Sequence, residues 1–129
     1  MIFAPPWLGE LLAEVEPLAA DDHVAALRDP DWLPGTIRLG RIGQSFADRA
    51  DELTPAQRRL VLRVLERELA VGSEETVAAI ATGFFEALLN AWDQGFDLRP
   101  AWEEMGPESR AHCRAWNRFG GIREPGWMR

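Results

Sequence analysis

The sequence predicts an all-α protein, a single compact bundle of five or six helices in which residues 1–129 form one helical domain. Three observations lead to this prediction. Apolar residues recur every three to four positions along most of the chain, which is the period of an amphipathic helix. Helix-capping residues precede several of these segments. No segment shows the two-residue alternation that is typical of a half-buried strand.

Length and composition agree with one globular domain. The chain has 129 residues, and 47% of them are apolar while 27% are charged. Domains most often contain roughly 100–150 residues. A chain of this size can bury about two-thirds of its unfolded surface, which is enough for one hydrophobic core.

The first helix is expected over residues 8–16. Its apolar side chains fall on one face: Leu8, Leu11, Leu12 and Val15. Pro17 should end this helix, because the residue before a proline is disfavoured in the helical conformation. A short helical segment is expected after Asp21, with Val24 and Leu27 directed inward.

Residues 29–35 contain two prolines and a glycine, so they are expected to form a loop. A second long helix should follow over residues 36–50. One of its faces carries large apolar side chains at helical spacing: Leu39, Ile42 and Phe46. Gly40 and Gly43 weaken this helix by roughly 1 kcal/mol each relative to alanine. They either permit close packing against a neighbouring helix or mark a kink.

The next helix has the clearest start. Thr54, Pro55 and Gln57 supply an N-cap hydroxyl, a proline at the first helical position and a glutamine at N3, which together form a capping box. Gly72 is a plausible C-terminal stop.

A central helix is expected to follow immediately. Ser73 should cap it, and Glu74 and Glu75 lie in its first turn, where the helix dipole favours acidic side chains. The helix should end near Asp93. It is apolar on nearly every side, and such helices are buried. Its large apolar residues are Val77, Ile80, Phe84, Phe85, Leu88, Leu89 and Trp92.

Two further helices are expected near the C-terminal end. Pro100 should begin a short one, and Pro107 should begin a last helix that ends at the Gly120-Gly121 pair. Residues 122–129 are expected to be irregular. Three side chains should share one side of the last helix: Cys113, Trp116 and Phe119.

The charge and apolar patterns exclude several classes of protein. The formal net charge is −7, which argues against nucleic-acid binding because phosphate contacts need a basic face. The longest apolar stretch, residues 77–92, is interrupted by Glu86 and Asn90 and is too short for a typical membrane-spanning helix of about 20 residues. A lone cysteine cannot form an internal disulfide and fits a cytoplasmic location. No targeting segment is recognisable in the sequence.

Candidate catalytic and metal-binding groups are sparse, so we expect no enzyme activity, no metal and no cofactor. His112 and Cys113 are adjacent, and neighbours on a helix point about 100° apart. The Asp21-Asp22-His23 run contains metal-ligating residue types, but no second ligand motif supports it, so helix capping is the favoured role.

Glu86 lies in the middle of the most apolar helix. A buried carboxylate needs a charged or hydrogen-bonding partner. An arginine from residues 109–129 is the expected partner, in a structural pair with no catalytic role.

The charges are unevenly distributed along the sequence. Residues 69–108 contain eight acidic residues and one arginine, whereas residues 109–129 contain five arginines and one glutamate. An acidic surface of this kind steers a basic protein partner toward it, and a tryptophan within it supplies buried area. The predicted partner-binding residues are Glu74, Glu75, Trp92, Asp93, Asp97, Trp102, Glu103, Glu104 and Glu108.

Two alternatives remain open for these acidic residues. They can be solvated side chains that pair with arginines inside the fold, with both tryptophans in the core. The interface can instead lie at an N-terminal acidic block, whose main members are Glu10, Glu14, Asp21 and Asp22.

Two segments carry a resemblance to a known class of proteins. They are ATGFFEALLNAW (residues 81–92) and MGPESRAHCRAWNRFGG (residues 105–121). Together they resemble the small acidic helical immunity proteins of bacterial polymorphic toxin systems, over roughly residues 56–121. The resemblance implies a helical protein that binds and blocks one cognate toxin domain without catalysis. Proteins of this class share no catalytic residues, so the resemblance assigns no catalytic role to any residue of this chain.

The functional prediction is therefore a non-catalytic binding protein. It would neutralise a cognate bacterial toxin by covering its active or substrate site through an acidic surface. The expected partner is a basic toxin domain, with no nucleic acid and no membrane involved. A helical adaptor or regulatory module is the alternative, and an enzyme that binds a small ligand in an interhelical pocket is the third.

Overall fold

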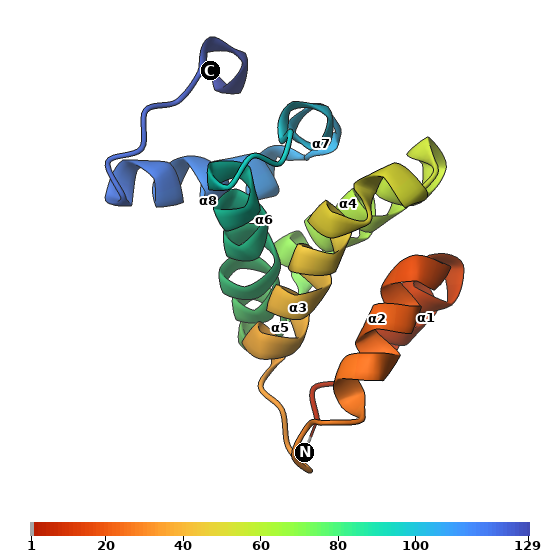
Figure 1. Cartoon of the computed structure of the whole chain (residues 1–129). Helices are drawn as coiled ribbons and strands as arrows, with labels where there is room; N and C mark the ends of the chain where they lie inside the picture. Colours follow the sequence, from red (N-terminus) through yellow and green to blue (C-terminus); the bar gives the residue numbers. More distant parts are fainter. Residues whose placement is uncertain (1) are drawn as a thin grey trace.

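The computed structural model describes residues 2–129 and is all-helical over that range, which confirms the predicted class. Figure 1 shows the helices packed around a steep central rod. The α-helices are α1 (Pro6–Glu14), α2 (Glu16–Ala26), α3 (Gly35–Asp48), α4 (Pro55–Val71), α5 (Glu74–Ala78), α6 (Glu86–Asp93), α7 (Arg99–Glu104) and α8 (Pro107–Phe119). The chain also forms short 3₁₀ helices, η1 (Ala50–Glu52) and η3 (Gly126–Met128). Within residues 2–129, β-pairing is limited to one isolated bridge between Ile2 and Leu33.

The central rod consists of α5, a π-helical segment η2 (Ala79–Phe85) and α6, which follow one another without a break. It matches the predicted helix over residues 73–93, and its inner side chains are fully buried: Ile80, Phe84, Phe85 and Leu88. Counting the rod as one helix and leaving the 3₁₀ helices aside, the described chain has seven helices, more than the five or six predicted.

Glycines bring α3 into close contact with the central rod. A Cβ atom added at Gly43 would lie 2.6 Å from the carbonyl oxygen of Phe84, and one added at Gly83 would lie 2.6 Å from that of Thr36. The backbones therefore approach closely because side chains are absent, which confirms the close-packing alternative for Gly43. Phe46 then packs edge-on against Phe84, with ring centroids 5.6 Å apart.

The start of α2 differs from the prediction. Pro17 occupies its first turn, so α2 begins directly after α1 and several residues before Asp21. Leu18 is fully buried and therefore marks the face of α2 that packs on the core. Val24 is 57% exposed and Leu27 is 75% exposed. At 100° per residue, Val24 lies about 120° from Leu18 and Leu27 lies about 180° from it. The prediction that these two side chains point inward is wrong.

The ends of α4 agree with the prediction. The Thr54 hydroxyl accepts a hydrogen bond from the Gln57 amide, and the Gln57 side chain accepts one from the Thr54 amide, each at 3.0 Å. Gly72 follows the last residue of α4, and the Ser73 hydroxyl accepts from the Thr76 amide at 3.1 Å to cap α5.

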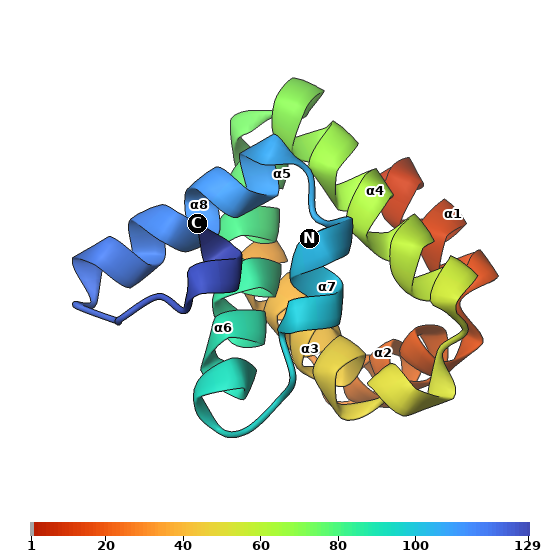
Figure 2. The same ribbon diagram turned by 90° about the horizontal axis from the view of Figure 1, so that it is seen from above.

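The C-terminal segment packs back onto the fold. Figure 2 shows it returning along α8 toward the centre of the molecule. Met128 is fully buried, and Trp127 packs edge-on against Trp92 and Trp102. Residues 122–125 are irregular, as predicted, whereas Gly126–Met128 form the 3₁₀ helix η3. Cys113 is fully buried, whereas Phe119, which was predicted to share one side of α8 with it, is 90% exposed.

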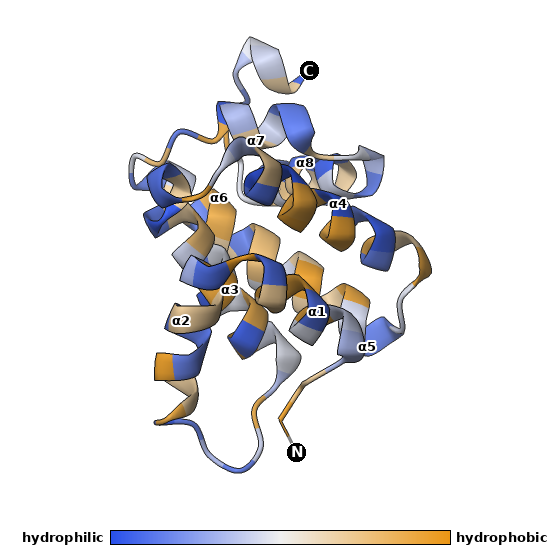
Figure 3. Ribbon diagram, turned by 90° about the vertical axis from the view of Figure 1, so that its right-hand side faces the viewer, coloured by the Kyte–Doolittle hydropathy of each residue, from blue (hydrophilic) through white to orange (hydrophobic). Residues whose placement is uncertain are grey.

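Figure 3 shows apolar residues concentrated where helices meet, with polar residues on the outer faces. The buried apolar side chains form one cluster that draws on every α-helix except α5. Over residues 2–129, no helix has both the length and the apolar character needed to cross a membrane.

Candidate binding groove

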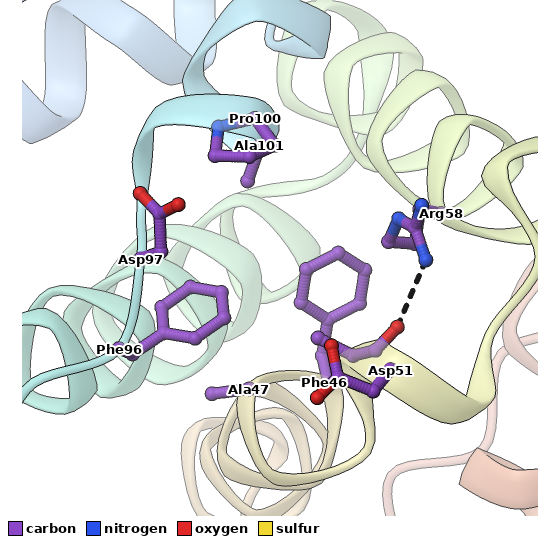
Figure 4. Close-up of a pocket in the computed structure, with 9 residues that line it drawn as sticks. Phe46, Ala47, Asp51, Arg58, Phe96, Asp97, Pro100 and Ala101 are labelled. Atoms are coloured by element: carbon purple, nitrogen blue, oxygen red, sulfur yellow. Dashed lines mark hydrogen bonds between the residues drawn. The ribbon is translucent and has the colours of Figure 1, made fainter.

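A groove of about 340 Å³ opens between the end of α3 with η1 and the segment that joins α6 to α7 (Figure 4). It collects residues that are far apart in the sequence. We call it the acidic groove, and its lining residues are Phe46, Ala47, Ala50, Asp51, Arg58, Phe96, Asp97, Pro100 and Ala101.

The floor of the acidic groove is apolar. Phe46 is anchored in the core and is fully buried, whereas Phe96 is partly exposed. Gly95 has φ of 111°, a left-handed conformation that favours glycine, and this turn ends α6. The Phe96 amide then donates to the Ala91 carbonyl at 3.0 Å, which holds the ring beside α3. Figure 4 shows both phenyl rings directed toward the middle of the groove.

Two exposed carboxylates flank this floor. Figure 4 shows Asp97 and Asp51 on different sides of the two rings. Asp97 accepts a hydrogen bond from the Arg99 amide at 3.3 Å, so it also helps to start α7. Neither carboxylate forms an ion pair within residues 2–129. Both negative charges are therefore available at the rim.

Arg58 is the cationic residue of the groove, and it contacts backbone carbonyls. Its Nη1 donates to the carbonyl oxygens of Ala50 and Leu53, at 2.9 and 2.5 Å. These bonds fix η1 against the start of α4. They position Asp51 without neutralising it.

A second hollow of about 240 Å³ adjoins the acidic groove and shares Ala47 and Phe96 with it. It adds the exposed carboxylate of Asp48, which accepts a hydrogen bond from Gln44 at 2.9 Å. The acidic rim therefore extends along the end of α3.

This arrangement suits a cationic side chain. The methylene groups of an arginine or lysine can lie along the partly exposed ring of Phe96, while the charged end reaches a carboxylate. Pairing with Asp51 or Asp97 adds charge-assisted hydrogen bonds.

The predicted acidic residues do not form one continuous surface. Glu74 and Glu75 are exposed at the start of the rod, and Asp93 is exposed at its other end, about 27 Å away at 1.5 Å per residue. Asp97 lies in the acidic groove and Glu108 is exposed on α8. Two more carboxylates are exposed but already paired with arginines: Glu103 with Arg99 at 3.5 Å, and Glu104 with Arg59 at 3.2 Å.

The two predicted tryptophans belong to the interior. Trp102 is 2% exposed, so the prediction that it offers an aromatic contact to a partner is wrong. It is covered by Trp127 and by the side chains of Arg110 and Arg114, which stack on its ring. Trp92 is partly buried against the core and packs on Trp127.

Part of the alternative N-terminal acidic block is neutralised inside the fold. Asp22 pairs with Arg38 at 2.8 Å, and Asp21 pairs with Arg49 at 2.9 Å. Hydrogen bonds from Arg49 and then from Ser45 lower the pKa of Asp21. These carboxylates join α2 to α3 and are poorly placed to attract a partner. Helix capping, the role predicted for them, is also wrong, because they lie within α2.

The other reactive groups are separated from one another. Cys113 is buried, and burial raises the pKa of its thiol to about 12. His112 points instead toward Glu86, with Nε2 and a carboxylate oxygen 3.5 Å apart. Within residues 2–129, no three histidine, cysteine or acidic side chains are grouped so that they could hold a metal ion.

Comparison with known proteins found no matching family model, no matching curated protein and no matching solved structure. The function proposed below therefore depends on the geometry of this chain.

Sequence analysis named Asp97 as a partner-binding residue but did not name the other side chains that line the groove in that role. Asp51 and Phe96 are 45 positions apart, and Phe46 looks like an ordinary core residue in the helical pattern. The one local signal was Gly95, because a glycine after a helix indicates a left-handed turn that redirects the next side chain.

Proposed function

We propose that this protein is a non-catalytic binding protein that neutralises a basic bacterial toxin domain in the cytoplasm. Binding would cover the active or substrate site of that domain. The observation that carries the proposal is the acidic groove, in which two unpaired carboxylates, Asp51 and Asp97, flank an aromatic floor.

The groove offers a partner both apolar contact area and electrostatic attraction. Phe96 is partly exposed and supplies apolar surface that a partner side chain can cover, while the buried Phe46 supports it from below. The carboxylates attract a basic domain and increase its association rate, since steering of this kind accelerates binding by 10- to 1,000-fold. Toxins that act on nucleic acids or nucleotides need basic surfaces, which an acidic inhibitor can block.

The test is a growth assay in a heterologous host. A candidate toxin, encoded beside this gene, is expressed alone, with the wild-type chain, and with the double variant Asp51→Asn and Asp97→Asn. Asparagine removes each charge, and its side-chain oxygen at position 97 can still accept the hydrogen bond from the Arg99 amide. We expect the wild-type chain to restore growth and the double variant to lose most of that protection.

Purified proteins then identify the step that fails. The double variant should melt at the wild-type temperature and bind the inactivated toxin domain with an on-rate about three- to tenfold lower, at the lower end of the steering range. Full protection by the double variant at matched expression would move the interface away from the acidic groove. Failure of the wild-type chain to protect against any neighbouring candidate would contradict toxin neutralisation.

A helical adaptor is the second candidate function, and a separate apolar surface favours it. Figure 1 shows the end of α2, the following loop and the start of α3 at one end of the molecule, beside the N-terminus. Five large apolar side chains are exposed there, namely Ile2, Val24, Leu27, Trp32 and Ile37. An adaptor needs two surfaces for two partners. Trp32→Ser should then abolish binding of one partner and preserve binding at the acidic groove.

A further inference from the structure

Two arginines on α8 form a feature that the proposed function does not use. Arg110 and Arg114 are one helical turn apart, and both guanidinium groups stack on the ring of Trp102, at 5.2 and 5.5 Å from its centroid. The two positive charges are therefore held close together on one face of the helix.

Neither arginine is neutralised by a carboxylate. The chain has 21 acidic residues, and six of its other arginines form ion pairs within the described residues: Arg38, Arg41, Arg49, Arg59, Arg67 and Arg99. No ion pair within residues 2–129 includes Arg110 or Arg114, although both side chains are half-buried. Two partly desolvated cations without a counter-ion favour an anionic ligand.

Backbone contacts fix the orientation of both guanidinium groups. Arg110 donates from Nε and Nη2 to the carbonyl oxygen of Trp102, at 3.1 and 2.8 Å. Arg114 donates from Nε and Nη2 to the carbonyl oxygen of Met128, at 2.9 and 2.5 Å. No hydrogen bond within the described chain uses the Nη1 group of either arginine. These donors have no partner within residues 2–129, and the backbone contacts fix the orientation of their guanidinium groups.

A hollow of about 350 Å³ lies between these side chains and is also lined by Met105, Pro107 and Ala111. Its walls are thus cationic on one side and apolar on the other. It is large enough for a small organic anion, since ligand pockets begin at about 300 Å³.

We propose that this hollow binds the phosphate group of a phosphate monoester, with Arg110 and Arg114 as the two ligands and the apolar wall against the organic part. A phosphate monoester carries a charge of about −1.5 to −2 near neutral pH, which balances two guanidinium groups. A carboxylate carries one negative charge and would leave one arginine unpaired. Arginine also offers planar pairs of donors that match phosphate oxygens.

The test uses phenyl phosphate as the probe and follows the arginine Nε–H signals of the full chain by NMR. We expect saturable shifts at Arg110 and Arg114. Acetate at equal ionic strength should bind at least tenfold more weakly. Phosphate binding should also weaken as the pH falls below the second phosphate pKa of about 6, where the ligand becomes a monoanion.

Two matched variants separate the site from general charge effects. Arg110→Lys with Arg114→Lys keeps both charges and removes the guanidinium geometry, so affinity should fall at least tenfold. Arg118→Lys with Arg123→Lys changes two exposed arginines that form no ion pair within residues 2–129, so affinity should remain unchanged. If the first pair fails to fold, each single substitution is titrated instead.

Three results would overturn the proposal: no saturable shift, equal affinity for acetate and phenyl phosphate, or equal losses in both variant pairs. A short neutral peptide that contains phosphoserine identifies the source of the phosphate. Binding of the peptide at least as tight as that of phenyl phosphate assigns the site to a phosphorylated chain, and weaker binding assigns it to a small phosphate ester. Toxin binding is not measured in these titrations, so their outcome is independent of the proposed function.

Discussion

Glu86 lies on the central rod, as predicted, but its partner is not the predicted arginine. Its side chain is 19% exposed on the central rod, and its neighbour is His112. The prediction of an arginine partner is wrong because of the helical spacing on α8. Arg110 and Arg114 each lie two residues from His112, which turns them about 160° away from it.

Replacement of Glu86 by glutamine should stabilise the protein at pH 7. Burial raises the pKa of Glu86, and the nearby imidazole opposes only part of this effect. The folded state therefore binds the Glu86 proton more tightly than the unfolded state, so stability falls as the pH rises through the unfolded pKa and then the raised folded pKa. Thermal melting should show the variant above wild type at pH 7, with the gap closing below about pH 4. A wild-type chain that melts above the variant at about pH 5, where an imidazole carries a positive charge, would instead mean that the ion pair with His112 dominates.

Glu66 on α4 has a structural role that can be measured. Its carboxylate accepts hydrogen bonds from the Glu108 amide, the Ser109 amide and the Ser109 hydroxyl, at 2.9, 2.9 and 2.8 Å. It therefore caps the N-terminus of α8 from a neighbouring helix, where the helix dipole favours a negative charge. Ser109 is fully buried, so loss of the acceptor leaves its hydroxyl unsatisfied.

We expect Glu66→Ala to lower the free energy of unfolding by about 2–3 kcal/mol, the combined effect of a lost cap and an unsatisfied buried hydroxyl. Urea denaturation provides the measurement. Arg63→Ala is the control on α4, because Arg63 is exposed and forms no ion pair within residues 2–129, so this change should alter the free energy of unfolding by less than about 0.5 kcal/mol. Equal losses in the two variants would contradict the capping role.

At the scale of elements, the contact between α3 and the central rod depends on individual glycines. Gly43 and Gly40 lie one turn apart on α3, yet their surroundings differ. A Cβ atom at Gly43 would clash with the Phe84 carbonyl at 2.6 Å, whereas one at Gly40 would make ordinary contact with the Gly83 carbonyl at 3.7 Å.

The two alanine substitutions should therefore have opposite effects. Gly43→Ala should destabilise the protein by about 1–3 kcal/mol through overpacking. Gly40→Ala should stabilise it by about 0.5–1 kcal/mol, because alanine is the better helix former and restricts the unfolded chain. Chemical denaturation of both variants measures the difference. A stabilised Gly43→Ala variant would show that α3 can move away from the rod at little cost.

The elements were predictable where local chemistry determines them. The Thr54 capping box and the Ser73 cap are local hydrogen bonds, and both are present at the predicted residues. The π-helical segment η2 was not predicted, because its hydrogen-bond register depends on packing against α3 and is absent from the apolar period. The acidic groove was missed for the same reason, since it is formed by elements that meet only in the tertiary structure.

At the scale of the whole molecule, the charges are unevenly distributed between α8 and the acidic groove. Residues 109–129 are basic and lie on and after α8, while the acidic groove lies between α3 and the segment before α7. A basic partner should approach the acidic groove and avoid the arginines of α8. The field near the groove should then control association more than the net charge of −7 does.

Three double variants separate local charge from net charge, because each removes two carboxylates. The variants are Asp51→Asn with Asp97→Asn at the groove, Glu74→Gln with Glu75→Gln at the start of the rod, and Glu10→Gln with Glu14→Gln on α1. Stopped-flow mixing with the inactivated toxin domain measures the on-rate from 20 mM to 500 mM salt. The groove variant should associate most slowly at low salt and should approach wild type at high salt, where the Debye length falls to a few ångströms. Equal slowing in all three variants would mean that net charge alone steers the partner. A larger effect at Glu74 and Glu75, or at Glu10 and Glu14, would assign the interface to that end of the molecule.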